Sequence, residues 1–464
     1  MSHRFDPTVL REYDIRGVVG DMLGAADAHA VGRSFATCIR HAGGHRVVVG
    51  RDGRLSSPML EAALVEGLAA GGVDVVRIGL CPSPMLYYAE AMLGVDGGIV
   101  VTGSHNPVDH NGFKLVMGHR PFWGDDITDL AGIAAAGDWA DGAGTVTDID
   151  VLGDYVARLM AGWDIAGGGG LRIGWDCGNG AAGPAVERLT ALLPGEHHLL
   201  HVEPDGRFPH HHPDPGDEAN LADLRALVAA KRLDLGLAFD GDGDRIGAID
   251  GQGRILWGDR ILAILAEPLL RELPGATIIA DVKASQTVFD RIAALGGEPC
   301  IARTGHSPIK AKMVETGAPL AGELSGHIFF AQDWYGFDDA LYAAVRLIRA
   351  VCLSGRSLAE LRDAMPACVS TPDLRIPVPE DRKLAVVAEV AARLDAAGVT
   401  ADTTDGVRVT AADGWWLVRS SNTEAAVTIR AEATDAEGLA RILATIDTHL
   451  AACGVVRAPG ISIF

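Results

Sequence analysis

The sequence predicts an α/β protein made of three similar α/β domains and a smaller C-terminal α+β domain. Three observations lead to this prediction. The 464 residues correspond to about three or four domains at roughly 150 residues each. Three apolar runs that end in aspartate are each followed by a helix-like stretch. The part of the chain after about residue 369 departs from this pattern.

The three apolar runs are expected to be buried strands, and they occupy residues 46–52 (RVVVGRD), 171–176 (LRIGWD) and 277–281 (TIIAD). The helix-like stretches that follow them lie at 57–72, 184–193 and 285–297. Continuous apolar strands that alternate with helices are typical of a mostly parallel sheet. A second strand-like run in each unit leads into a polar, glycine-rich loop, at 103–107, 240–245 and 322–326. This internal similarity favours three related domains over a solenoid of short repeats.

The last part of the chain begins with a proline-rich passage, residues 371–382, that could be a linker. A helix-like stretch, the loop RSSNTE (419–424), a strand and a final helix follow, which together predict the α+β domain. The glycine run at 167–170 is a second boundary signal. We expect domain boundaries at 1–150, 151–254, 255–368 and 369–464.

Composition excludes several classes of function. The chain has 61 acidic and 40 basic residues and a formal net charge of −21, so its surface repels nucleic acid and anionic membranes. Seven isolated cysteines predict neither a disulfide framework nor a zinc site, and they favour a reducing, cytoplasmic setting. The N-terminal sequence has no signal-peptide core, and no apolar run is long enough to span a membrane. Any site for a phosphate must therefore gather cations locally.

The motif DGDGDR (240–245) is the most specific metal signal in the sequence. Asp240, Asp242 and Asp244 alternate with glycines, which allow a tight turn that brings three carboxylates to one cation. Oxygen ligands favour Mg²⁺ or Mn²⁺ over zinc. A calcium EF-hand is excluded because Arg245 and Gly251 stand where it needs glycine and glutamate.

Other loops carry candidate catalytic and phosphate-binding groups. TGSHNP (102–107) places Ser104 and His105 at the end of a buried strand, without the surroundings of a hydrolase nucleophile elbow or a P-loop. Arginine forks and hydroxyl groups suit phosphate oxygens, and glutamate, serine and histidine suit sugar hydroxyls and proton transfer. The residues of these types in polar loops are Arg16, Lys114, His306, Lys310, Glu323, Ser325, His327, Arg419, Ser420, Ser421, Asn422 and Thr423.

One motif indicates a different function. GNGAAG (178–183) fits the pattern of a dinucleotide-binding loop, and Glu203 stands at the spacing of the ribose-binding acid. On its own this motif would indicate an NAD-dependent dehydrogenase. The same glycines also suit a tight turn between a strand and a helix, which is the interpretation we prefer.

Together these motifs resemble the α-D-phosphohexomutase family, in particular its bacterial phosphomannomutase/phosphoglucomutase branch. The match runs through nearly the whole chain in family order: YDIRG, TGSHNP, NGFK, FPHHHPDP (208–215), DGDGDR, DVK (281–283), GHSPIK, GELSGH and RSSNTE. The resemblance implies four domains, three of them alike with mixed sheets, arranged around a central cleft. Each domain would contribute one loop, in the order phosphoserine, metal, sugar and phosphate.

The resemblance also implies residue roles. Ser104 would carry the phosphoryl group, and the metal would be held by Ser104, Asp240, Asp242 and Asp244. The other catalytic residues would be His105, Lys114, Arg245 and His327. The substrate would be bound by Tyr13, Arg16, Lys283, His306, Glu323, Ser325, Arg419, Ser421, Asn422 and Thr423. Gly103 and the pair Glu424-Ala425 depart from the commoner family residues without removing a chemical group.

The implied reaction interconverts hexose 1-phosphate and hexose 6-phosphate of mannose or glucose, with Mg²⁺ as cofactor and hexose 1,6-bisphosphate as intermediate and activator. Partners would be small hexose phosphates, without nucleic acid or membrane, on a monomer or small homo-oligomer in the cytoplasm. The alternatives are a phosphoglucosamine mutase of the same family, an NAD-dependent dehydrogenase, or a sugar-phosphate sensor without catalysis. Asn422 and Leu324 favour the mannose/glucose branch over the glucosamine branch.

Overall fold

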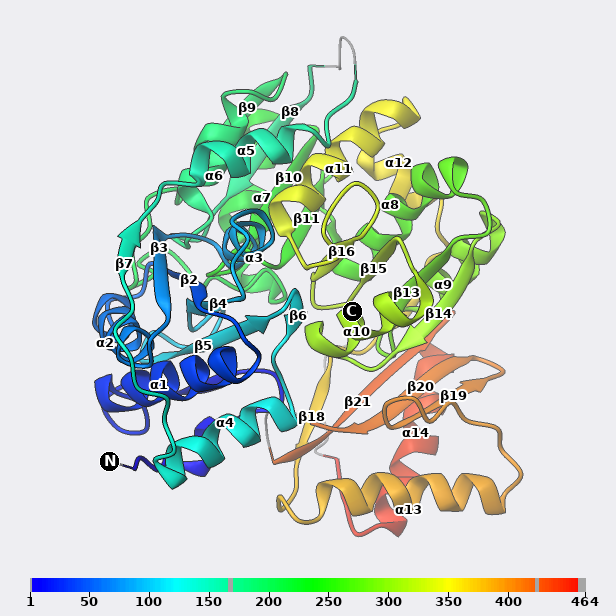
Figure 1. The fold of residues 1–464 in the computed structure, drawn as a ribbon. Coiled ribbons are helices and arrows are strands. Elements are labelled where there is room, and N and C mark those ends of the chain that lie inside the picture. The colour runs from blue at the N-terminus through cyan, green and yellow to red at the C-terminus, as the bar shows by residue number, and fades with distance from the viewer. Residues whose placement is uncertain (1, 166–169, 422–424, 458–464) are drawn as a thin grey trace.

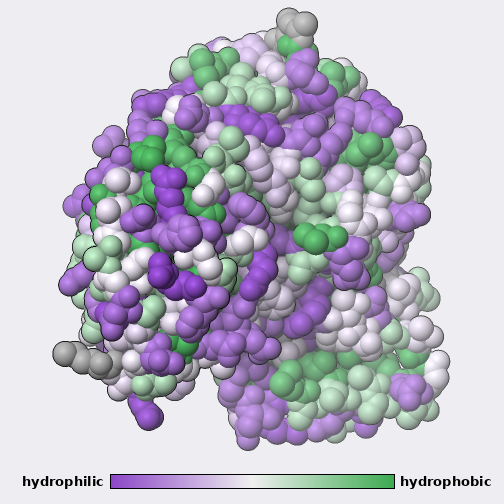
Figure 2. Space-filling view, viewed as in Figure 1, coloured by the Kyte–Doolittle hydropathy of each residue, from purple (hydrophilic) through white to green (hydrophobic). Residues whose placement is uncertain are grey.

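The computed structural model of the chain describes residues 2–165, 170–421 and 425–457. Four sheets, each covered by helices, follow one another along the chain (Figure 1). The first three lie in an arc from the lower left over the top to the right of Figure 1, and the fourth lies at the lower right. Figure 2 shows a mixed hydrophilic and hydrophobic face that is indented at its lower edge, between the first and the last domain.

The first sheet has the strand order β1-β5-β4-β2-β3-β7, with β6 paired to β5. Strands β2, β3, β4 and β7 run parallel, and β5 and β1 run antiparallel to their neighbours. The strands are β1 (Ile15–Val18), β2 (Arg46–Arg51), β3 (Asp74–Leu80), β4 (Gly97–Val101), β5 (His110–Met117), β6 (Arg120–Pro121) and β7 (Val146–Asp148), and the helices are η1 (Pro7–Val9), α1 (Ala25–His41), α2 (Ser57–Ala70), α3 (Ser83–Met92) and α4 (Asp125–Ala136).

The second sheet has the order β12-β11-β10-β8-β9, with β8, β9 and β10 parallel and β11 antiparallel to β10. Its elements are α5 (Leu152–Met160), β8 (Arg172–Asp176), α6 (Gly183–Thr190), β9 (Glu196–Leu200), η2 (Glu218–Leu221), α7 (Ala222–Lys231), β10 (Leu235–Phe239), β11 (Ile246–Asp250) and β12 (Ile255–Leu256).

The third sheet has the order β14-β13-β15-β16, again with three parallel strands and an antiparallel last one. Its elements are α8 (Gly258–Glu272), β13 (Thr277–Asp281), α9 (Gln286–Ala294), β14 (Glu298–Ala302), α10 (His306–Thr316), β15 (Leu320–Gly322), β16 (Ile328–Phe330), α11 (Ala340–Ser354) and α12 (Leu358–Asp363).

The internal similarity predicted from the sequence is confirmed by the strand orders. The four-strand units β3-β2-β4-β5, β9-β8-β10-β11 and β14-β13-β15-β16 share one order and one pattern of directions. The three apolar runs that end in aspartate are β2, β8 and β13. Both expectations about strand direction are confirmed: three strands of each four-strand unit run parallel, as the apolar runs predicted, and the antiparallel strand after each glycine-rich loop makes all three sheets mixed, as the resemblance implied.

The C-terminal sheet is antiparallel, with the order β17-β21-β20-β19 and with β18 also paired to β21. It has its own apolar core, between residues 374 and 455, whereas one continuous apolar cluster runs through the first three domains. Its elements are β17 (Val369–Ser370), β18 (Leu374–Pro377), α13 (Lys383–Ala396), β19 (Val407–Ala411), β20 (Gly414–Ser420), β21 (Ala426–Ala433) and α14 (Ala436–Ala452). Among the described helices, none is long and apolar enough to cross a membrane.

Candidate active site

Ser104 lies in the loop between β4 and β5, in the left-handed backbone region at a φ of 49°. Its side chain is buried, and its Oγ donates a hydrogen bond to Asp240 Oδ2 at 2.9 Å. Its backbone N–H donates to Thr102 Oγ1 at 2.8 Å. A non-glycine residue with positive φ persists where its surroundings hold it, and such residues are frequent at functional sites. The loop therefore presents the serine oxygen to the second domain.

Arg54 holds this loop by hydrogen bonds to its backbone, and no motif in the sequence indicated this role. Its guanidinium is buried and donates to the carbonyl oxygens of Ser104 (2.7 Å), Asn106 (2.6 Å), Pro107 (2.6 Å) and His110 (2.9 Å). A Cβ on Gly103 would lie 2.4 Å from Nε of Arg54, so this position requires glycine. The departure from the commoner family residue at 103 thus has a local structural reason.

The three aspartates of the DGDGDR loop follow β10 and are all fully buried. Gly243 takes a φ of 72°, and a Cβ on Gly241 would lie 2.4 Å from the carbonyl oxygen of Ser104. The glycines therefore allow both the turn and the close approach of the serine loop. Asp240 Oδ1 accepts the backbone N–H groups of Asp244 and Arg245, both at 3.1 Å.

The charge of this cluster is only partly balanced by the protein. Lys114 Nζ donates to Oδ2 of Asp242 (2.7 Å) and of Asp244 (2.5 Å). Burial lowers the pKa of Lys114, but the two carboxylates outweigh it, so this pKa is raised well above its usual value. Burial together with Asp242 and Asp244 raises the pKa of Asp240. One ammonium group thus faces three carboxylates.

Two carboxylate oxygens of the cluster lack a partner. Oδ1 of Asp242 and Oδ1 of Asp244 are buried and accept no hydrogen bond from the described residues. A buried polar atom without a partner costs free energy, so these oxygens are available to a ligand. The carboxylates of Asp240, Asp242 and Asp244 also lie close enough together to share one ion. An oxygen-only set of this kind fits Mg²⁺.

His327, from the third domain, faces the metal loop. Arg245 Nε donates to His327 Nε2 at 3.0 Å, while His327 Nδ1 lies 2.9 Å from Asp338 Oδ2 and 3.6 Å from Asp244 Oδ1. These partners assign the proton to Nδ1. Lys310 Nζ donates to the other oxygen of Asp338 at 2.9 Å. Asp338 was missed in the sequence, although the consecutive acids of GFDD (336–339) could have indicated it.

The loop that carries Glu323 and Ser325 lies between β15 and β16. Glu323 is buried, its Oε1 accepts the backbone N–H of Gly305 at 2.6 Å, and Ser325 is half-buried. His306 begins α10, and its ring centroid lies 6.0 Å from that of His327 and 5.8 Å from that of Tyr13. Burial lowers the pKa of His306 well below its usual value. Side chains from the first and third domains therefore meet here.

The remaining predicted residues lie on three other segments, with Arg16 in β1, Lys283 directly after β13, and Arg419 near the end of β20. Arg16 Nη1 donates to Asn106 Oδ1 at 2.6 Å, beside the serine loop, and Lys283 Nζ lies 3.5 Å from Asp373 Oδ2. Arg419 is the next-to-last residue of β20 and is buried, with its Nε 3.1 Å from Asp405 Oδ2, and Ser421, directly after β20, is also buried. The predicted residues Asn422 and Thr423 lie outside the described residues. A cavity of about 570 Å³ lies next to this loop and is lined by residues of the first, third and last domains, but it does not include Ser104.

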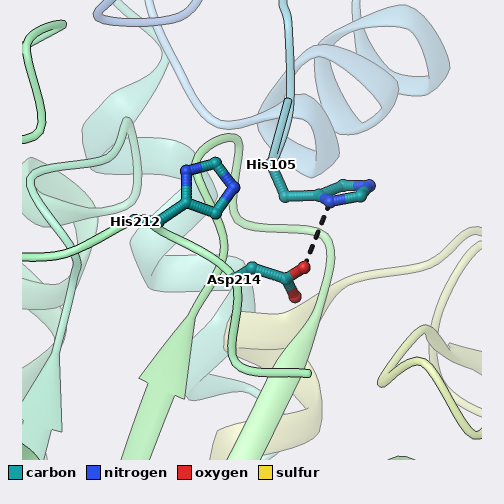
Figure 3. Close-up of side chains that lie close together, drawn as sticks. All are labelled: His105, His212 and Asp214. Atoms are coloured by element: carbon teal, nitrogen blue, oxygen red, sulfur yellow. Dashed lines mark ion pairs between the residues drawn. The ribbon is translucent and has the colours of Figure 1, made fainter. Parts of the chain in front are cut away.

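His105 turns from the serine loop toward the second domain. Its Nδ1 lies 3.2 Å from Asp214 Oδ2, and Figure 3 shows this contact with His212 beside it. Burial, with the nearby Arg245 charge, lowers the pKa of His105 to about 3, and the contacts with Asp214 do not offset this. A neutral histidine paired in this way links the serine loop to the 208–215 segment. Asp214 belongs to the predicted FPHHHPDP motif, but the sequence did not single it out.

Backbone N–H groups of the GNGAAG loop already donate hydrogen bonds to neighbouring segments of the protein. The N–H of Gly178 donates to Asp176 Oδ1 (3.0 Å), that of Gly180 to the Cys177 carbonyl (2.7 Å), and that of Ala181 to the Gly241 carbonyl (2.9 Å). A dinucleotide loop needs such N–H groups for the pyrophosphate. The glycines instead bring this turn against the metal loop, which supports the structural interpretation over the dehydrogenase one.

The chain matches four families of protein domains that cover most of its length. Residues 7–138, 154–253 and 257–368 match phosphoglucomutase/phosphomannomutase alpha/beta/alpha domains I, II and III, and residues 374–449 match the C-terminal domain of the same set.

Similar proteins match over nearly their whole length. The phosphomannomutase/phosphoglucomutase of Pseudomonas aeruginosa PAO1 is 43% identical over 96% of both chains, and a phosphoglucomutase of Neisseria gonorrhoeae is 40% identical over 94% of this chain and 95% of its own. A crystal structure of a phosphoglucomutase/phosphomannomutase family protein from Burkholderia thailandensis has a TM-score of 0.91 and 42% identity, and covers 99% of both chains. The resemblance seen in the motifs is thereby confirmed: this chain belongs to the phosphoglucomutase/phosphomannomutase family.

Proposed function

We propose that the protein is a phosphohexomutase that interconverts the 1- and 6-phosphates of mannose, glucose or both. Phosphorylated Ser104 and a hexose 1,6-bisphosphate would be the intermediates. The observation that carries this proposal is the position of Ser104 Oγ, 2.9 Å from Asp240 in a buried cluster of three carboxylates. The names of the two relatives described above support the choice of mannose and glucose. Domain boundaries at 1–150, 151–254, 255–368 and 369–464 remain part of the proposal.

Magnesium would be held by Asp240, Asp242 and Asp244 together with the phosphorylated Ser104. The two unpartnered carboxylate oxygens and the excess of negative charge over Lys114 support this assignment. When bound, the ion supplies electrostatic stabilisation of the transferring phosphoryl group. A phosphate group next to three carboxylates would be repelled by them, so its binding there would require the positive charges of Mg²⁺ and Lys114.

In the reaction, the bond between Ser104 Oγ and phosphorus breaks as a free sugar hydroxyl forms a new bond to phosphorus. The hydroxyl proton must pass to a base, and His327 is our candidate. Its Nδ1 lies against Asp338, which orients the ring, and Arg245 would move from Nε2 toward the phosphate oxygens when substrate binds. Lys114 is held as an ammonium group, so it would neutralise charge and not accept the proton.

Binding of the substrate would use the other loops. Arg419 and Ser421, together with Asn422 and Thr423, would hold the phosphate that does not react, which supplies orientation. Glu323 and Ser325 would bind sugar hydroxyls. We assign the further contacts of the sugar and its phosphates to Tyr13, Arg16, His105, Lys283 and His306. The bisphosphate must turn over between the two transfers, so these contacts must serve both orientations.

The test is a coupled assay with glucose 1-phosphate and mannose 1-phosphate, with and without a trace of the bisphosphate. We expect turnover of both sugars, its loss on chelation of the metal, and its recovery with Mg²⁺. Ser104→Ala should abolish turnover and also the mass increase that follows incubation with glucose 1,6-bisphosphate. Ser354→Ala, at the end of α11, is the matched control. Full activity of Ser104→Ala would refute the proposal, and a preference for glucosamine 1-phosphate would indicate the alternative mutase.

A further inference from the structure

A second group of metal-ligand side chains lies in the second domain and shares no residue with the DGDGDR loop. Asp176 ends β8, His201 follows β9, and His211 belongs to the 208–215 segment. One potential ligand atom of each lies within 4.8 Å of those of the other two. Six of the 16 histidines of the chain fall between residues 197 and 212. The catalytic proposal uses none of these three side chains.

Both ring nitrogens of His211 face oxygen acceptors, an arrangement that favours a cation at this position. Its Nδ1 lies 2.9 Å from the carbonyl oxygen of His212, and its Nε2 lies 3.0 Å from Asp176 Oδ2. A neutral imidazole carries only one N–H, so two oxygen acceptors are satisfied either by an imidazolium or by a metal ion at one nitrogen. The position therefore favours positive charge between His211 and Asp176.

The other two ligands are oriented by neighbours of the kind found around metal sites. Asp176 Oδ1 accepts the N–H of Gly178 at 3.0 Å, which leaves Oδ2 for the cluster. His201 Nε2 lies 3.2 Å from Asp223 Oδ2, an arrangement that places the proton on Nε2 and the lone pair on Nδ1. The His201 ring stacks on that of His210, with centroids 4.0 Å apart.

The backbone conformation and the burial of these residues also indicate that the site is preformed. His201 is held at a φ of 50°, and its carbonyl oxygen accepts the N–H of Asn179 at 2.8 Å. The side chain of Asp176 is fully buried, and those of His201 and His211 are 10% and 14% exposed. An ion could therefore enter from solvent, while the carboxylate lies at the inner end of the cluster.

We propose that Asp176, His201 and His211 form a second cation site that takes a transition metal of the Zn²⁺ class. Two imidazoles and one carboxylate form a set of three zinc ligands that leaves a fourth position for water. Mg²⁺ prefers oxygen ligands, so the two sites differ in the metal that they select. Bound zinc would join the ends of β8 and β9 to the segment that carries Asp214, the partner of His105. This inference does not depend on the proposed reaction.

The experiment is a calorimetric titration of the full-length protein with Zn²⁺. The protein is first stripped of metal and then supplied with saturating Mg²⁺, which occupies the carboxylates of the DGDGDR loop. We expect the wild type to bind about one zinc ion per chain. The His201→Gln variant should bind zinc at least about tenfold more weakly, since even changes outside the ligand shell lower metal affinity about 10–100-fold. His198→Gln is the matched control, because His198 lies on the same strand, β9, and pairs with Glu196. Zinc should also raise the melting temperature of the wild type and of this control, but not that of His201→Gln.

Two further variants identify the site. Asp242→Asn removes a carboxylate of the DGDGDR loop and should leave the zinc titration unchanged, whereas His211→Gln should weaken it as His201→Gln does. Circular dichroism of the metal-free variants establishes that each is folded, and the partly exposed His201 provides the test if His211→Gln is not. Zinc binding that is absent from the wild type, insensitive to His201→Gln, or lost with Asp242→Asn would overturn the proposal.

Discussion

Replacing Arg54 with lysine tests whether the serine loop is held in its active geometry by a single buried guanidinium. Arg54 donates hydrogen bonds to four carbonyl oxygens of this loop and pairs with Asp52 at 3.3 Å. A lysine keeps the charge, but its donors sit at one point and cannot span four acceptors. Hydrogen bonds from a charged donor contribute roughly 1.5–3 kcal/mol each, so the loss of two corresponds to roughly 3–6 kcal/mol.

This loss should appear in both stability and turnover. A displacement of Ser104 Oγ by about 1 Å is enough to reduce kcat about 100-fold. We expect Arg54→Lys to lower kcat by at least this factor in the coupled mutase assay, and to lower the midpoint of urea unfolding. The carbonyl oxygens, and not the charge, would be responsible, since the net charge is unchanged.

The matched control is Arg51→Lys. Arg51 ends β2, close to Arg54 in the chain, but it pairs with Glu61 at 3.1 Å on the other side and is partly exposed. This control should retain kcat within about twofold, because lysine keeps the positive charge that faces the buried Glu61, and Arg77 also pairs with Glu61 at 3.1 Å. The reasoning would be refuted by an Arg54→Lys enzyme with unchanged kcat and unfolding midpoint.

Three further predictions concern residues around the site. Asp338→Asn removes the charge shared by His327 and Lys310, and kcat should fall about 100-fold with little change in KM, measured by steady-state kinetics. Burial raises the pKa of Asp339 to about 7, so this carboxyl binds its proton more tightly in the folded chain than in the unfolded chain. The free energy of unfolding should therefore fall by at most about 4 kcal/mol as the pH rises from about 4 through 7. Urea titrations at each pH should show this fall in the wild type and not in Asp339→Asn. Gly103→Ala should destabilise the protein by roughly 1–3 kcal/mol in the same titration, because its Cβ would meet Arg54; an unchanged midpoint would contradict the crowding.

The features that could be predicted well from the sequence are those that depend on local patterns of residues. Strands β2, β8 and β13 were visible as continuous apolar runs because strands buried on both faces need no alternation. The loops that follow β4, β10 and β15 were visible because glycines and charged groups interrupt an apolar run. The mixed direction of the sheets was predicted only through the resemblance of the motifs, because the apolar pattern of β11 is the same whether it pairs parallel or antiparallel.

The features that could not be predicted depend on contacts between distant segments. Arg54 lies 50 residues from the serine that it supports and looks in sequence like a surface arginine after a strand. Asp338 and Asp214 contact His327 and His105 only in the folded chain, so no local pattern in the sequence indicates these contacts. Asn422 and Thr423 lie outside the described residues, so their predicted role is still a prediction. A sequence motif identifies reactive groups, whereas the residues that orient them are chosen by packing.

The repeated unit explains why these groups meet at all. In each of the first three domains the glycine-rich loop joins the last parallel strand to an antiparallel one, as between β4 and β5 or β10 and β11. The loop thus leaves the same edge of each sheet, and three copies placed around one centre bring three such edges together. The chemistry then differs only in which side chains each copy carries: a hydroxyl, three carboxylates, or a glutamate with a histidine. The absence of a side chain at Gly241 lets the first two loops touch, since a Cβ there would collide with the Ser104 carbonyl at 2.4 Å. Contact between Ser104 and the three aspartates of the DGDGDR loop therefore follows from fold repetition together with one glycine, which neither the domains nor the motifs would provide separately.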